Sequence, residues 1–202
     1  MQVRNIKFYP QWESLEMTDL ICSQQLEASK DPKWRDSGAS SAKEYQLWSW
    51  NICGMACLKM ILKKKFNKEF PTITLAKQAE QFNAYRINGK IIDGLFYKEF
   101  CEFIREKYNL VGHIRKYYPL WLLRRDFRKG LFIIASVSSS IRDPRLNLKS
   151  KGGHLVLVTG IGDKNISFHN PSGIYLETQI NHTLPIKTFK NYYANRGIAI
   201  KP

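Results

Sequence analysis

Three residues spread along the chain have the types needed for nucleophilic catalysis: Cys53, His154 and Asn170. The apolar residues after Cys53 surround most of the circumference of a helix predicted over residues 53–65, which is typical of a central buried helix. A thiol in the first turn feels the positive end of the helix dipole, which favours the nucleophilic thiolate. Gly54 has no Cβ, so a substrate backbone could approach closely. The structural alternative for Cys53 is a buried core cysteine.

His154 is the candidate general base. It follows Gly152-Gly153 and begins the apolar run Leu-Val-Leu-Val, which predicts a strand. The two glycines leave space beside the histidine, so a histidine at the start of this strand is well placed to form part of the wall of a cleft. The structural alternative is a histidine whose hydrogen bonds serve only the fold.

Asn170 is the candidate for holding that base in place. A turn at residues 162–165 joins the strand of His154 to a second predicted strand at 166–169, which ends just before Asn170. Simple hairpin register pairs Asn170 with about position 157, and a bulge at Gly160 or Gly162 would bring its side chain to His154. An amide oxygen there accepts from the imidazole and fixes its tautomer. The Asn-Pro pair also starts a turn, and the residue can do both.

The three blocks together resemble the C39-like branch of the papain-like cysteine peptidases. They have the sequences Trp-Asn-Ile-Cys-Gly-Met-Ala-Cys, Gly-His-Leu-Val-Leu-Val-Thr-Gly-Ile and Ile-Ser-Phe-His-Asn-Pro, in the family's order of Cys, His and Asn or Asp. The resemblance covers residues 42–202 or so. It implies an α+β, papain-like two-lobed fold, with the nucleophile on a central helix of an N-terminal helical lobe and an antiparallel β-sheet in the C-terminal lobe.

The chain departs from the family's pattern at two positions. The branch commonly has Asp-Pro where this chain has Asn170-Pro171, and asparagine is the papain-type residue. Papain-like enzymes also place a glutamine before the cysteine as a donor to the oxyanion. Leu47 occupies that spacing here, so the candidate is Gln46, one residue farther away, with Ser49 or Asn51 as substitutes. Loss of one such donor typically costs a factor of about 10²–10³ in rate.

The resemblance implies a cysteine hydrolase that cleaves a peptide or isopeptide bond through an acyl-thioester, without a metal or organic cofactor. Its partner would be a peptide or protein substrate. Two alternatives stay open: an acyltransferase or transpeptidase that uses the same three residues, and a catalytically silent C39-like domain that binds a peptide. Substrate specificity and oligomeric state do not follow from the sequence.

Further elements are expected around these blocks. Asn51 is the expected N-cap of the cysteine helix and Asp93 that of a helix ending near Tyr108. Residues 46–202 are expected to form one domain, and residues 1–45 an N-terminal extension packed on the body through Trp12, Trp34 and Tyr45. The remaining expected elements are helices at 74–83, 119–128 and 186–193 and strands at 111–117, 131–138 and 197–201.

The composition limits the classes of function. The chain of 202 residues has a net charge of +15, which attracts anions in general, but its basic residues lie in no recognisable nucleic-acid motif. No specific nucleic acid is therefore expected. The absence of a signal-peptide core or a long apolar run predicts a cytoplasmic location. The 4 cysteines lack metal-ligand spacing and are expected as free thiols; Cys57, His113 and His169 are assigned to structure.

Overall fold

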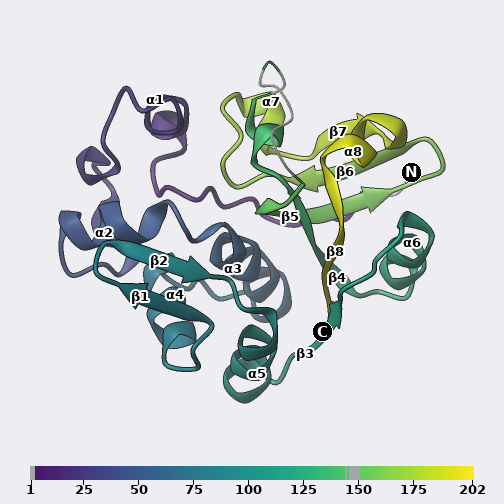
Figure 1. Ribbon diagram of the computed structural model, residues 1–202, viewed down its shortest axis with the longest axis horizontal. Coiled ribbons are helices and arrows are strands. Elements are labelled where there is room, and N and C mark those ends of the chain that lie inside the picture. The colour runs from purple at the N-terminus through teal and green to yellow at the C-terminus, as the bar shows by residue number, and fades with distance from the viewer. Residues whose placement is uncertain (1–2, 144, 146–150) are drawn as a thin grey trace.

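The computed structural model describes residues 3–143, 145 and 151–202. It is an α+β structure, in which a group of helices lies beside a twisted antiparallel sheet (Figure 1). None of the helices in this described part of the chain has both the length and the apolar character that crossing a lipid bilayer requires.

The helical part is built around one buried helix, α3 (Cys53–Phe66), which confirms the helix predicted over 53–65. Every residue from Gly54 to Leu62 is buried, because apolar side chains occupy all of its faces. Asn67, in the left-handed conformation, ends the helix. The elements packed around α3 are α2 (Ala42–Ser49), α4 (Thr72–Glu80), the hairpin β1 (Tyr85–Asn88) and β2 (Ile91–Gly94), and α5 (Tyr97–Tyr108).

The sheet has 6 strands in the order β3-β8-β4-β5-β6-β7, and every neighbouring pair is antiparallel. Alternate residues of its central strands enter two different cores: Ile134 packs on the side of α3, whereas Ile133 packs on the opposite face with α6 (Leu120–Arg128) and α8 (Ile186–Tyr192). The strands are β3 (Val111–Arg115), β4 (Phe132–Ser138), β5 (Gly153–Ile161), β6 (Asn165–His169), β7 (His182–Pro185) and β8 (Tyr193–Lys201).

The predicted hairpin is present as β5 and β6, and it contains a bulge. Pairing shifts by one residue between Val158 and Gly160, so that Leu157 lies opposite His169. The extra residue moves Asn170 one position closer to His154 than the simple register does, as expected for a bulge near Gly160.

Several sequence-based boundaries were wrong. Asn51 does not cap α3: Ile52 is its N-cap residue, and the Asn51 side chain donates instead to the Leu47 carbonyl at 3.2 Å. Asp93 lies in strand β2, and α5 begins only at Tyr97. The hairpin of β1 and β2, β7 and the short helices α1 (Thr18–Cys22) and α7 (Leu176–Gln179) were not predicted, because short elements carry too little periodicity.

The N-terminal segment, purple in Figure 1, crosses from the sheet to the helical side. Near the sheet, the Arg4 amide donates to the Thr159 carbonyl at 2.7 Å. Farther along, the Gln11 backbone amide donates to the Pro171 carbonyl at 2.7 Å, and its side chain donates to the Ser49 carbonyl at 2.6 Å. The segment therefore joins the loop after Asn170 to the helix that precedes Cys53.

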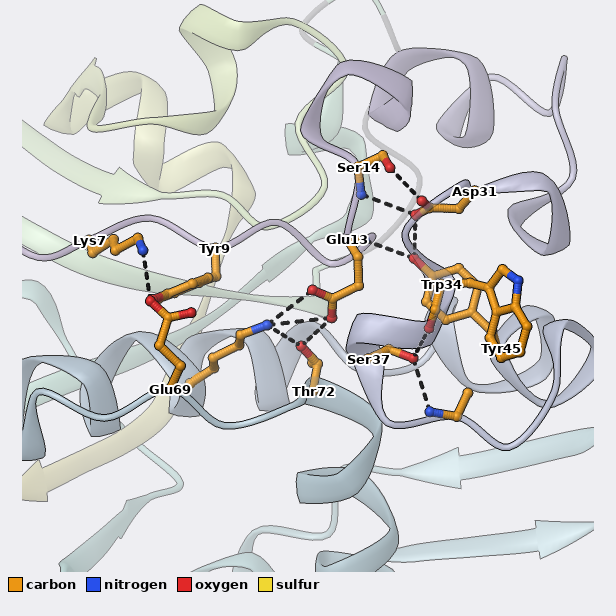
Figure 2. A network of polar contacts seen from close by, with 12 residues as sticks. Lys7, Tyr9, Glu13, Ser14, Asp31, Trp34, Ser37, Tyr45, Glu69 and Thr72 are labelled. Atoms are coloured by element: carbon orange, nitrogen blue, oxygen red, sulfur yellow. Dashed lines mark hydrogen bonds and ion pairs between the residues drawn. The ribbon is translucent and has the colours of Figure 1, made fainter.

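Buried polar contacts hold this segment in place (Figure 2). Lys59 of α3 forms an ion pair with Glu13 at 3.1 Å, and their side chains are only 7% and 12% exposed. Thr72 donates to the same carboxylate at 2.8 Å. Nearby, the Asp31 carboxylate accepts from Tyr45 at 2.6 Å and from Ser14. Trp12 and Tyr45 are fully buried, which places the segment in the same core as α3.

Candidate functional site

Cys53 and His154 line one cavity of about 420 Å³. The walls come from the N-terminal end of α3, the connection between β2 and α5, and the strands β4, β5 and β8. The remaining lining residues are Trp50, Asn51, Gly54, Gly94, Leu95, Phe96, Tyr97, Ser136, Arg142, Gly153, Leu155 and Arg196.

Cys53 is the first residue of α3 and is partly exposed. In the described part of the chain, no side-chain hydrogen bond caps this end of the helix, so the first-turn amides remain available to a substrate. Gly54 is closely packed: a Cβ there would lie 2.8 Å from Leu95 Cδ2 and 3.1 Å from Leu155 Cδ1, so these two side chains would have to shift. The missing side chain thus lets the N-terminal end of α3 approach the start of β5.

His154 and Asn170 form the hydrogen bond that the sequence predicted. The His154 Nε2–H donates to Asn170 Oδ1 at 2.7 Å, and both residues are buried. Asn170 is itself fixed, since its side-chain amide donates to the Ile141 carbonyl at 3.3 Å and its backbone amide to the Gln179 carbonyl at 2.9 Å. The other ring nitrogen, His154 Nδ1, is buried without a hydrogen-bond partner in the described part of the chain.

The protonation state of Cys53 differs from the thiolate that the sequence predicted, and His154 is uncharged as well. Burial raises the pKa of the Cys53 thiol, although the Arg142 charge and the backbone amides of Leu155, Gly54 and Cys53 act to lower it. Burial, and then the Arg142 charge, lower the pKa of His154 to about 3. Both shifts favour the uncharged forms, so at neutral pH the free protein holds a thiol and a neutral imidazole. Desolvation outweighs the helix dipole here.

Alkylation of Cys53 by neutral iodoacetamide should therefore follow an alkaline titration. The raised pKa keeps the thiol protonated until the pH exceeds 9.0, its ordinary value, so the rate should climb through that region without a plateau near pH 7. Rates at Cys53 can be measured by mass spectrometry between pH 5 and pH 10. A plateau below pH 7 would instead mean a thiolate–imidazolium pair in the resting protein.

Gln46 is not brought to this cavity. It lies on α2, where its Oε1 accepts from the Ser29 amide at 2.8 Å, and it lines a neighbouring cavity of about 710 Å³. Of the two substitutes, Ser49 is buried and does not line the Cys53 cavity, whereas Asn51 does. Asn51 and Trp50 line both cavities, so the two are adjacent.

The cavity also contains residues that the sequence analysis missed. Arg142 is half-buried, donates through Nε to Ser172 Oγ at 2.7 Å and changes the pKa of both Cys53 and His154. Ser172 is buried and does not itself line the cavity, but its Oγ lies 3.3 Å from His154 Nε2. Arg196 reaches the cavity from β8. Only the Asn-Pro-Ser-Gly turn gave a signal, for Ser172; nothing in the pattern distinguished the two arginines from the chain's other basic residues.

Other cysteines and histidines lie outside the cavity lining. Cys57 is buried in the core, with its thiol 3.8 Å from the Leu155 carbonyl. The ring of His169 is bonded to the Ile6 carbonyl at 2.9 Å and accepts from the Asn181 amide at 3.1 Å. His113 lies in edge strand β3. These placements agree with the structural assignment of Cys57 and His169, and all four cysteines are free thiols.

Neither protein-family models, nor curated proteins, nor solved structures gave a match to this chain.

Proposed function

We propose that this protein is a papain-like, C39-like cysteine hydrolase that cleaves a peptide or isopeptide bond. One observation carries the proposal: His154 shares a cavity with Cys53 and gives its Nε2–H to Asn170, while its Nδ1 has no hydrogen-bond partner among the described residues. A nucleophile, a base and a residue that orients the base are the parts that covalent acyl transfer needs.

The hydrogen bond to Asn170 determines which nitrogen is the base. Asn170 Oδ1 can only accept, so the proton of neutral His154 resides on Nε2 and the lone pair on Nδ1. A buried nitrogen whose lone pair has no partner lowers the stability of the folded protein, so its presence calls for an explanation such as a role in catalysis. The thiol proton of Cys53 is the partner that the proposal assigns to it.

The reaction then proceeds through a thioester. Nδ1 of His154 removes the Sγ–H proton as Sγ bonds to the substrate carbonyl carbon, and the carbonyl oxygen becomes an oxyanion. The oxyanion collapses, the C–N bond breaks, and the leaving amine takes the proton from His154. Water gives a proton to His154 as its oxygen bonds to the thioester carbonyl carbon; the C–Sγ bond then breaks, the carboxylic acid is released, and the proton passes from His154 to Sγ. The neutral resting pair makes His154 a general base instead of half of a preformed ion pair.

Two hydrogen-bond donors at or just before the N-terminal end of α3, the Cys53 backbone amide and the Asn51 side chain, are assigned to the oxyanion. The Cys53 backbone amide belongs to the first turn of α3 and has no intrahelical acceptor. Asn51 lines the cavity, and its side chain is assigned the role first expected of Gln46. One of its two N–H groups donates to Leu47, which orients the amide and leaves the second for the substrate.

A peptide-library digest tests the proposed function. The purified chain and its Cys53→Ala variant are incubated with a proteome-derived peptide mixture, and new termini are identified by mass spectrometry. New termini formed only by the wild type support hydrolysis. Products that carry an added primary amine would identify a transferase, and peptide binding without any new bond would identify the silent binding domain.

Replacing Asn170 by alanine should reduce turnover about 10–100-fold, the usual cost of losing the group that orients a histidine. The variant removes the acceptor at 2.7 Å, so the ring can rotate and the Nε2–H tautomer is no longer favoured. The matched control is Asn170→Asp, which retains an acceptor oxygen and should keep most of the activity. Equal losses in both variants would mean that Asn170 supports only the loop. Initial rates on one cleaved peptide decide between these outcomes.

A further inference from the structure

Two guanidinium groups, Arg142 and Arg196, line the same cavity as Cys53 and His154. The contacts of both are with hydroxyl groups: Arg142 Nε donates to Ser172 Oγ at 2.7 Å, and Arg196 Nε to Ser136 Oγ at 3.5 Å. Across residues 3–143, 145 and 151–202, neither arginine forms an ion pair with an acidic side chain. The neighbouring carboxylate, Asp143, is paired with Arg145 at 2.8 Å.

Both arginines are positioned by the protein. Arg142 ends the short 3-10 helix Ser139–Arg142, and its backbone carbonyl accepts from the Ile174 amide at 2.9 Å. The Arg196 guanidinium lies against Gly152, where a Cβ would be only 2.6 Å from Nη2. Gly152 has φ of +107°, a conformation that favours glycine, so the backbone beside His154 leaves space for the second guanidinium.

The Arg142 charge lies close to the reacting groups, and Arg196 lines the same cavity. The Arg142 charge lowers the pKa of both Cys53 and His154, which places it within electrostatic reach of both. A guanidinium binds carboxylates with matched geometry, and a half-buried one such as Arg142 is less well hydrated than one on an open surface. Arg196 is exposed but lines the same cavity. Two guanidinium groups at a cavity whose described lining contains no carboxylate favour an anionic ligand.

We propose that Arg142 and Arg196 form a carboxylate-binding subsite next to Cys53. On the proposed hydrolase function, the substrate then carries an Asp or Glu side chain, or a free C-terminal carboxylate, beside the carbonyl that Cys53 attacks. Arg142 and Arg196 are specificity-determining residues in this reaction. The anion subsite itself does not require that a bond be cleaved.

Alkylation by two reagents of similar size tests the subsite without a substrate. Iodoacetate carries a carboxylate and iodoacetamide does not. The ratio of their rates at Cys53 is measured by mass spectrometry and divided by the same ratio for N-acetylcysteine amide, which has no carboxylate, in the same buffer. We expect a normalised ratio of about 10, because opposite charges attract strongly in such a cavity. The ratio should fall as salt is added, because salt screens this attraction.

Three variants assign the effect to the cavity. Arg196→Gln and Arg142→Gln should each lower the normalised ratio several-fold. Arg128→Gln, at the exposed end of α6 and outside the cavity, removes one charge from the protein and should leave the ratio unchanged. An equal effect of all three variants would mean that the net charge, and not the subsite, attracts the reagent, and would overturn the proposal.

The peptide digest distinguishes the two sources of the carboxylate. Cleavage sites enriched in Asp or Glu within the peptide assign the subsite to a side chain, whereas cleavage confined to the last residues assigns it to the C-terminus. Arg196→Glu should shift the preference towards Lys and Arg. A raised iodoacetate ratio without any cleavage would refute the hydrolase and keep the subsite. The subsite is rejected if neither the alkylation ratio nor the peptide digest shows a preference for a carboxylate. It is also rejected if the digest shows no such preference and neither reagent labels Cys53.

Discussion

Replacing Cys53 by alanine is expected to reduce peptide hydrolysis by a factor of about 10⁴–10⁶, the loss typical when a covalent nucleophile is removed. The cavity and the bond between His154 and Asn170 remain in such a variant, but no atom is left to form the thioester. Single-turnover measurements on one cleaved peptide, together with the mass of a trapped acyl-enzyme, would show the loss directly.

Cys57 provides the matched control. It lies one turn farther along α3, is buried in the core and does not line the cavity. Cys57→Ala should retain turnover and lose only a little stability, since a small buried side chain is shortened. If Cys53→Ala kept wild-type turnover, another group would be the nucleophile and the proposed function would be wrong.

Replacing Glu13 by alanine should lower the free energy of unfolding by about 3–5 kcal/mol, the cost typical of leaving one partner of a buried ion pair unpaired. Lys59 is buried within α3, and the Glu13 carboxylate is its partner at 3.1 Å (Figure 2). Without it, the ammonium keeps the Thr72 hydroxyl at 3.1 Å and the ring of Tyr9, whose centroid lies 4.9 Å away, but no carboxylate among the contacts of the described residues. Denaturant unfolding followed by circular dichroism measures the change.

The control for this prediction is Glu16→Ala. Glu16 pairs with Lys33 at the same distance, 3.1 Å, but both side chains are more than half exposed. Exposed pairs contribute little, about 0–1 kcal/mol, so this variant should unfold almost as the wild type does. Similar losses in the two variants would mean that burial of the Glu13 pair has no special effect. Paired removal, Glu13→Leu with Lys59→Met, should recover much of the lost stability, because neither charge then remains buried.

The sequence by itself determined the elements with strong periodicity. The apolar circumference after Cys53 predicted α3, and the alternation beginning at His154 predicted β5 with the hairpin that follows it. The hairpin register also indicated that a bulge at Gly160 or Gly162 would bring Asn170 to His154, and the observed register shifts between Val158 and Gly160. The hydrogen bond between His154 and Asn170 was predictable because both residues lie on one hairpin, where register relates sequence distance to spatial distance.

Tertiary structure decided the features that depend on groups far apart in the chain. Gln46 was a candidate from spacing alone, but the fold of α2 directs its Oε1 to the Ser29 amide. The pKa of Cys53 was expected to fall because of the helix dipole, a local effect. It is raised because other segments cover the thiol and remove water from it.

The same distinction explains why Arg142 and Arg196 were not found from the sequence. Each is one of the 32 basic residues of a strongly basic chain, and no local pattern marks either of them. They become notable only when strand β8 and the short helix before Asp143 bring them to the cavity of Cys53 without an acidic partner in the described structure. Periodicity reports which face of an element is buried, whereas the charges around a cavity follow from how separate elements pack together.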